Sequence, residues 1–128
     1  LRKLDGYIKR KRENAAYLSR ELHDLYVQLP TEEEYAFNVY YVYHLLMETE
    51  RKKQKAVESL GNQGVETRPL LSFIPAQPPY RRYESSVGAC AVAKNAYKKG
   101  FYVSNSPQLT RNELGYLASA LRKAVTEA

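Results

Sequence analysis

The chain has 128 residues, of which 44% are hydrophobic and 27% are charged, and its formal net charge is +6. A chain of this size buries enough surface to fold as one domain, which excludes general disorder, while its longest apolar run, around residues 39–47, is too short to span a membrane. One cysteine excludes an internal disulfide and a cysteine-based zinc site, and the excess of cations attracts anions without choosing between nucleic acid, phosphorylated sugars and acidic lipids.

A long amphipathic helix is predicted at the start of the chain. Apolar residues recur at every third or fourth position from Leu1 to Leu25, with one break at Lys11. The break lies within four consecutive cations, residues 9–12, which are typical of either a solvated face or a phosphate-binding patch. The chain starts inside this pattern without methionine or signal peptide, so we interpret it as a piece of a longer protein.

The remaining segments predict a small sheet with helices packed on it. Strands are expected at residues 27–30, 38–48, 64–71 and 101–104, with the tyrosine-rich segment 38–48 at the centre of the sheet. Helices are expected at residues 50–60, at 85–98 and after a capping box at 110–113, whereas three prolines predict an irregular loop at 75–79. The order indicates an α+β sandwich, with an antiparallel or mixed sheet of about four strands.

Residues that could carry chemistry of their own are few. His23 and His44 have no partner at metal-ligand spacing, and Cys90 is expected to be a small buried residue on a helix face built from alanines. The segment 99–103 begins like the aromatic strand of an RNA-recognition motif and then departs from it. A basic nucleic-acid-binding module and a protein-interaction domain without chemistry therefore stay as alternative functions.

The most informative stretch is residues 64–71, followed by 77–80. A strand that ends in arginine–proline and enters a proline–aromatic loop holds the guanidinium of Arg68 beside a rigid apolar wall. Such a group offers forked donors to a phosphate or a carboxylate. The alternative is a buried ion pair between Arg68 and an acid such as Glu66 or Glu84.

Four segments in order resemble the C-terminal portion of the DegT/DnrJ/EryC1/StrS family, which contains PLP-dependent nucleotide-sugar aminotransferases and 3-dehydratases. They are residues 1–15, the tyrosine–histidine strand 38–45, the arginine–proline strand and glutamine–proline loop 64–80, and residues 100–116. The resemblance implies the small domain of a fold-type-I enzyme. Many aminotransferases of the family carry a histidine near the position of Pro75, and the dehydratases usually continue the arginine–proline motif with glycine–asparagine where this chain has Ser72 and Phe73. These residues do not decide between the aminotransferase and the dehydratase branch of the family.

The resemblance also implies how the work is divided in the parent enzyme. Residues 1–25 would link to a large domain, absent here, that holds the cofactor PLP, and residues 26–128 would form a small domain that closes over the sugar-nucleotide pocket. Arg68, Gln77 and Tyr80 match motif positions in that pocket and are the expected substrate-binding residues. No lysine can be assigned the Schiff-base role, so we expect this chain alone to bind no PLP or metal and to be inactive.

The same resemblance implies the setting of the parent enzyme. It would be a cytoplasmic homodimer that acts on a nucleotide-linked keto sugar and an amino donor. Its products would be deoxy or amino sugars for cell-surface polysaccharides. Neither a membrane nor a nucleic acid is an expected partner.

Overall fold

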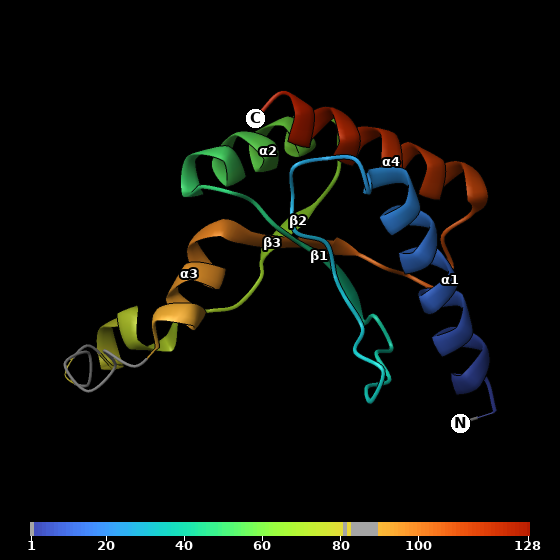
Figure 1. Ribbon diagram of the computed structural model, residues 1–128, viewed down its shortest axis with the longest axis horizontal. Coiled ribbons are helices and arrows are strands. Elements are labelled where there is room, and N and C mark those ends of the chain that lie inside the picture. The colour runs from blue at the N-terminus through green and yellow to red at the C-terminus, as the bar shows by residue number, and fades with distance from the viewer. Residues whose placement is uncertain (1, 81, 83–89) are drawn as a thin grey trace.

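The computed structural model describes residues 2–80, 82 and 90–128. In this part of the chain, four α-helices surround one face and one end of a small antiparallel sheet (Figure 1). The elements in chain order are α1 (Leu4–Leu22), β1 (Val42–Leu46), α2 (Glu50–Asn62), β2 (Thr67–Pro69), the 3₁₀ helix η1 (Ile74–Ala76), α3 (Ala91–Lys99), β3 (Gly100–Ser104) and α4 (Arg111–Thr126). The predicted α+β class is confirmed.

The sheet differs from the prediction in its size and in its central strand. The described residues form three strands in the order β1-β3-β2, so the centre is β3, and β1, which comes from the tyrosine-rich segment, lies beside it. The predicted strand at 27–30 is reduced to one bridge between Gln28 and Leu46, because Pro30 has no N–H group with which to extend the ladder. Strand β1 starts only at Val42, because Tyr40 adopts a left-handed backbone (φ 49°) that turns the chain out of the extended conformation.

The core lies between the sheet and the helices that pack on it. Helices α2 and α4 lie side by side across one face of the sheet, and α1 packs on α4 (Figure 1). The side chains that seal the core are fully buried: Tyr43, Leu45, Phe101 and Val103 from the sheet, and Leu18, Leu22, Leu60 and Leu121 from the helices. Each such large apolar side chain contributes on the order of 2 kcal/mol to folding.

Local hydrogen bonds set the helix ends. Thr49 accepts a bond from the amide of Lys52 (3.1 Å), and Thr110 and Glu113 form a complete capping box, so both predicted N-termini are confirmed. Helix α2 continues past the predicted end at residue 60 to Asn62. The chain changes direction after this helix at Gly64, whose φ of 71° lies in the left-handed region that glycine adopts without strain.

Two helices, α3 and α1, are more exposed than their sequences predict. Helix α3 contributes no buried side chain, and Cys90 is exposed, because this helix lies at one end of the sheet, where it contacts α2 and β3 but is not covered by α1 or α4 (Figure 1). The predicted start of this helix, at residues 85–89, lies outside the described residues. Helix α1 ends at Leu22 and buries only its second half, which leaves Leu4 49% and Tyr7 42% exposed. No described helix has the length and hydrophobicity that crossing a bilayer requires.

Candidate functional site

A row of three polar side chains crosses the sheet on the face opposite α2 and α4. His44 pairs with Tyr102, and Tyr102 pairs with Arg68, in the registers of β1 with β3 and of β3 with β2. Their neighbours Tyr43 and Val103 are buried in the core, and successive side chains of a strand alternate between faces. His44, Tyr102 and Arg68 therefore share the open face.

A cavity of about 390 Å³ lies at the Arg68 end of this row. It is the Arg68 cavity from here on. Its polar lining comes from four parts of the chain, namely Lys11 of α1, Tyr41 before β1, Glu66 and Arg68 around β2, and Tyr102, Ser104 and Asn105 at the end of β3. The size falls within the usual range for small-molecule sites, roughly 300–1,000 Å³.

Arg68 is held by an ion pair that solvent reaches. Its Nη2 atom lies 2.7 Å from Oε1 of Glu66, and the two side chains are 66% and 76% exposed. The pairing with Glu66 that the sequence offered as an alternative is therefore present, but the pair is not buried. An exposed pair is weak, so an anionic ligand can displace the carboxylate at little cost.

Lys11 supplies a second cation to the Arg68 cavity. Its Nζ donates to the carbonyl oxygen of Tyr41 at 2.9 Å and lies 4.9 Å from the centre of the Tyr41 ring. Partial burial lowers the pKa of Lys11 from its ordinary value. The ammonium is thus fixed in position, and it faces the same cavity as the Arg68 guanidinium.

Asn105 closes the floor of the cavity. It is 1% exposed, and its Nδ2 donates to the carbonyl oxygens of Lys11 (3.0 Å) and Tyr40 (2.7 Å). Its Oδ1 has no hydrogen-bond partner among the described residues. A buried acceptor without a partner is costly, and a water or a ligand hydroxyl entering the cavity would remove that cost.

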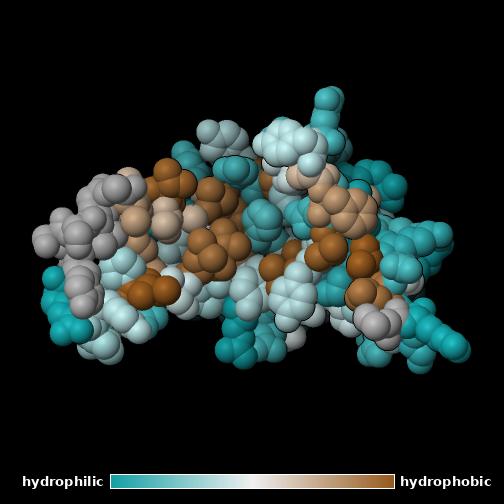
Figure 2. Space-filling model, turned by 90° about the horizontal axis from the view of Figure 1, so that it is seen from below, coloured by the Kyte–Doolittle hydropathy of each residue, from teal (hydrophilic) through white to brown (hydrophobic). Residues whose placement is uncertain are grey.

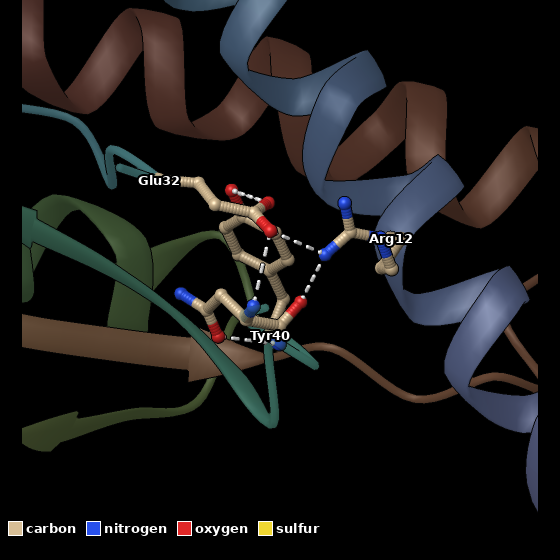
Figure 3. Close-up of polar contacts among 4 residues, drawn as sticks. Arg12, Glu32 and Tyr40 are labelled. Carbon is tan, nitrogen blue, oxygen red and sulfur yellow. Dashed lines mark hydrogen bonds and ion pairs between the residues drawn. The ribbon is translucent and has the colours of Figure 1, made fainter. Parts of the chain in front are cut away.

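Hydrogen bonds around the guanidinium of Arg12 position the segment that carries Tyr41. Figure 3 shows Arg12 of α1 reaching from the helix to Glu32 and to the backbone of Asn38, with bonds of 3.0 and 2.5 Å. The Glu32 carboxylate also accepts from the Asn38 amide (3.2 Å) and from the Tyr40 hydroxyl (3.3 Å). The Arg12 hydrogen bond is the main reason that the pKa of Glu32 is lowered. These contacts fasten residues 32–40 to α1, and with them one wall of the Arg68 cavity.

Comparison with known proteins identifies the chain. The family model described as the DegT/DnrJ/EryC1/StrS aminotransferase family matches residues 1–122. The chain belongs to the DegT/DnrJ/EryC1/StrS aminotransferase family. A curated relative, GDP-perosamine synthase of Escherichia coli O157:H7, is 23% identical over 124 residues, which are 96% of this chain and 33% of that protein. The chain thus spans about a third of the length of this relative, and the resemblance inferred from four sequence segments is confirmed.

Solved structures share the fold at low sequence identity. Spr1654 of Streptococcus pneumoniae, in its PMP form, superposes with a TM-score of 0.89 at 10% identity, covering 99% of this chain and 33% of that one. The Helicobacter pylori aminotransferase PseC, involved in the biosynthesis of pseudoaminic acid, gives 0.87 at 17% identity, covering 100% of this chain and 35% of that one. The architecture described above is therefore that of about one third of such an enzyme.

The structure separates the residues of the two family motifs. Arg68 of the arginine–proline motif lines the Arg68 cavity, whereas Gln77 and Tyr80 follow η1 in the segment beside α3, and neither lines that cavity. Both are exposed, and the Tyr80 amide donates to the Gln77 carbonyl oxygen at 2.9 Å. Their role in binding substrate stays a prediction.

The residues of the Arg68 cavity do not fit PLP, the cofactor that the family implies. That cofactor needs a lysine amine free to join its aldehyde, a carboxylate for its ring nitrogen and donors for its phosphate. The amine of Lys11 is engaged by the Tyr41 carbonyl, and the carboxylate of Glu66 is engaged by Arg68. We derive no chemical step through PLP from these residues.

Sequence reasoning missed three members of the site. Tyr102 and His44 were placed on strands, but the register that aligns them with Arg68 depends on long-range pairing. Lys11 lies within the run of cations, and only the packing of α1 against the end of β3 selects it from its neighbours. The one local signal for His44 in the sequence was a titratable side chain among the apolar residues of this strand.

Proposed function

We propose that this chain is the C-terminal domain of a PLP-dependent nucleotide-sugar aminotransferase and forms one wall of its sugar-nucleotide pocket. The observation that carries the proposal is the family match over residues 1–122, in a chain that spans about a third of its relatives. Structures of Spr1654 in PMP and PLP forms support PLP as the cofactor of the parent. The relatives' names support a sugar substrate, which the parent would take as a nucleotide-linked keto sugar together with an amino donor.

The open face of the sheet is where we place the rest of the parent. Figure 2 shows the side of the molecule away from α2 and α4, where apolar patches alternate with polar side chains. Large apolar residues are exposed on α1 (Leu4 and Tyr7), on the segment before β1 (Phe37) and after β2 (Leu71). A monomer rarely leaves that much apolar surface in water, so a large PLP-binding domain packed there would account for it. The division at residue 25 is part of this proposal.

Arg68, Gln77 and Tyr80 are the residues that we propose bind the substrate. The Arg68 guanidinium is exposed, and its ion-pair partner among the described residues is an exposed carboxylate, as suits a group that exchanges partners on ligand binding. In the parent, Gln77 and Tyr80 would contact the substrate from the loop that follows η1. A cytoplasmic homodimer and a role in deoxy or amino sugars for cell-surface polysaccharides complete the proposal.

A 3-dehydratase is the second candidate, because the arginine–proline–leucine–leucine sequence at residues 68–71 is typical of that branch. It acts on the same class of sugar nucleotide and differs in the fate of the sugar. An aminotransferase delivers an amine to the sugar, whereas a dehydratase removes its hydroxyl group.

The experiment compares the full-length parent with this chain alone. Both are incubated with PLP, reduced with borohydride and analysed by mass spectrometry. We expect a PLP–lysine adduct in the full-length protein and none in the 128-residue chain. A stoichiometric adduct in the chain alone would overturn the domain assignment. Product analysis with a nucleotide-linked keto sugar then decides the branch: an amino sugar supports the aminotransferase, and a 3-deoxy sugar supports the dehydratase.

A further inference from the structure

A second cavity, separate from the Arg68 cavity, lies between α1 and the first turn of α4. Its volume is about 620 Å³, and it shares no lining residue with the Arg68 cavity. Its lining from α1 is Arg10, Glu13, Asn14, Tyr17 and Arg20, and from α4 it is Arg111 and Leu114. We propose that this cavity, the arginine crevice, binds a phosphate-bearing small molecule.

Helix geometry gathers the charges. Arg10, Tyr17 and Arg20 recur at spacings of seven and three, which places them on one stripe of α1. Arg111 is the first residue of α4 and faces that stripe across the crevice. Three guanidinium groups against one carboxylate, that of Glu13, leave a local charge of about +2. This part of the cationic run at residues 9–12 thus faces a cavity and not open solvent alone.

The crevice keeps its shape because α1 and α4 are joined on both sides of it. Asn14, which is 2% exposed, donates from Nδ2 to the Ser106 carbonyl oxygen at 3.1 Å and so fixes the loop that leads into α4. Further along, Arg122 of α4 forms an ion pair with Asp24 (2.6 Å), which lowers the pKa of that carboxyl to about 2. A ligand would therefore meet guanidinium groups that are already close together, without ordering the backbone.

The arginines of the crevice are free to bind an anion. Arg10 lies 3.7 Å from Glu13 in a half-exposed pair. Arg20 lies over the ring of Tyr17 at 5.4 Å and 3.8 Å from Glu21, in a pair whose side chains are both exposed. The side chain of Arg111 forms no ion pair with the described residues. Weak or absent internal partners distinguish these three from Arg12 and Arg122, whose guanidinium groups are held by carboxylates and carbonyl oxygens.

The chemistry of the lining selects phosphate. Several guanidinium forks bind the tetrahedral oxygens of phosphate bidentately, and they gain most from a group with two negative charges. The positive end of α4 adds to the same field at Arg111. Tyr17, with Arg20 stacked over it, offers a flat surface to a base or another planar group next to the phosphates. Free pyrophosphate and a nucleoside diphosphate share this chemistry.

The test is a titration of the 128-residue chain with sodium pyrophosphate, followed by amide NMR at constant ionic strength. We expect saturable binding, with shifts concentrated at residues 10–20 and 110–114. The variants Arg111→Gln and Arg20→Gln should each weaken binding by about tenfold or more, the loss typical of a charged hydrogen bond. Arg51→Gln on the exposed face of α2 is the matched control and should change binding by less than about twofold.

Three outcomes would overturn the proposal. They are no saturable binding, an equal loss in Arg51→Gln, and Arg111→Gln binding as tightly as the wild type. Tighter binding of a nucleoside diphosphate than of pyrophosphate would identify a nucleotide as the ligand, and equal binding would identify free phosphate. An oligonucleotide that binds with shifts spread over the whole surface and a steep salt dependence would instead indicate a nucleic-acid interface. None of these results depends on the proposed aminotransferase function.

Discussion

Replacement of Arg68 by alanine separates a binding role from a role in folding. Among the residues that the structure describes, the side chain makes one ion pair, at 2.7 Å to Glu66, and the two partners are 66% and 76% exposed. Pairs this exposed contribute about 0–1 kcal/mol, so the free energy of unfolding should fall by less than about 1 kcal/mol. In a domain of this size that is a decrease in melting temperature of about 4 °C or less.

The assay is thermal and urea unfolding of the chain, followed by circular dichroism. Leu60→Ala is the control for a structural position, since Leu60 is fully buried and its truncation should cost about 2–5 kcal/mol. A decrease of about 10 °C or more for Arg68→Ala would show that the guanidinium stabilises the fold, and the reasoning from its exposure would be refuted.

The same substitution in the full-length parent tests the binding role. Loss of a charged hydrogen bond to the substrate should lower kcat/KM for the nucleotide sugar by about tenfold to a hundredfold. Glu66→Gln is the matched control, because it removes the competing carboxylate and leaves the guanidinium in place. We expect Glu66→Gln to retain or improve substrate use, and an equal loss in both variants would contradict the proposed role.

Three further predictions concern stability. Gly100→Ala should destabilise the chain by about 1–3 kcal/mol in urea unfolding. The reason is that a Cβ there would lie 2.6 Å from the Ala96 carbonyl oxygen and 2.7 Å from the Leu70 side chain. An unchanged midpoint of unfolding would contradict this. Gly115→Ala should stabilise it by about 0.5–1 kcal/mol in the same assay, since the nearest atom is 3.8 Å away and the position is helical; a loss would show unrecognised crowding. Burial lowers the pKa of His44, so on acidification the unfolded chain binds a proton at this residue before the folded chain does, and the free energy of unfolding should fall as the pH drops below about 6.5. The loss in the free energy of unfolding between pH 7 and pH 5 should be smaller in His44→Gln than in the wild type, and equal losses would refute the prediction.

Local signals predicted local structure. The start of α2 at Thr49 and the capping box of α4 depend on hydrogen bonds that span three residues, and both occur where the sequence indicates. The strand at residues 101–104 was also predicted nearly to its ends. Such features follow from the chemistry of adjacent side chains, so no knowledge of the tertiary structure was needed.

Features that depend on distant contacts were not predictable in the same way. The tyrosine-rich composition of residues 38–48 favoured a central strand, but strand order is decided by which partner fits on each side, and β3 takes the centre. The alanine-rich face around Cys90 suggested burial, yet Cys90 lies at the N-cap of α3, where none of the described residues buries it. For the site, the sequence singled out Arg68, and only the folded chain brings Lys11 and Tyr102 to it.

The central position of β3 has a consequence for synthesis of the protein on the ribosome. Within the sheet, β1 and β2 each pair with β3, and no ladder joins them to each other. Both therefore leave the exit tunnel before their common partner has been translated. Until residues 100–104 emerge, β1 and β2 both lack their common partner, and the apolar residues of β1 stay uncovered. This interval is therefore the one in which chaperone binding or aggregation would compete with folding.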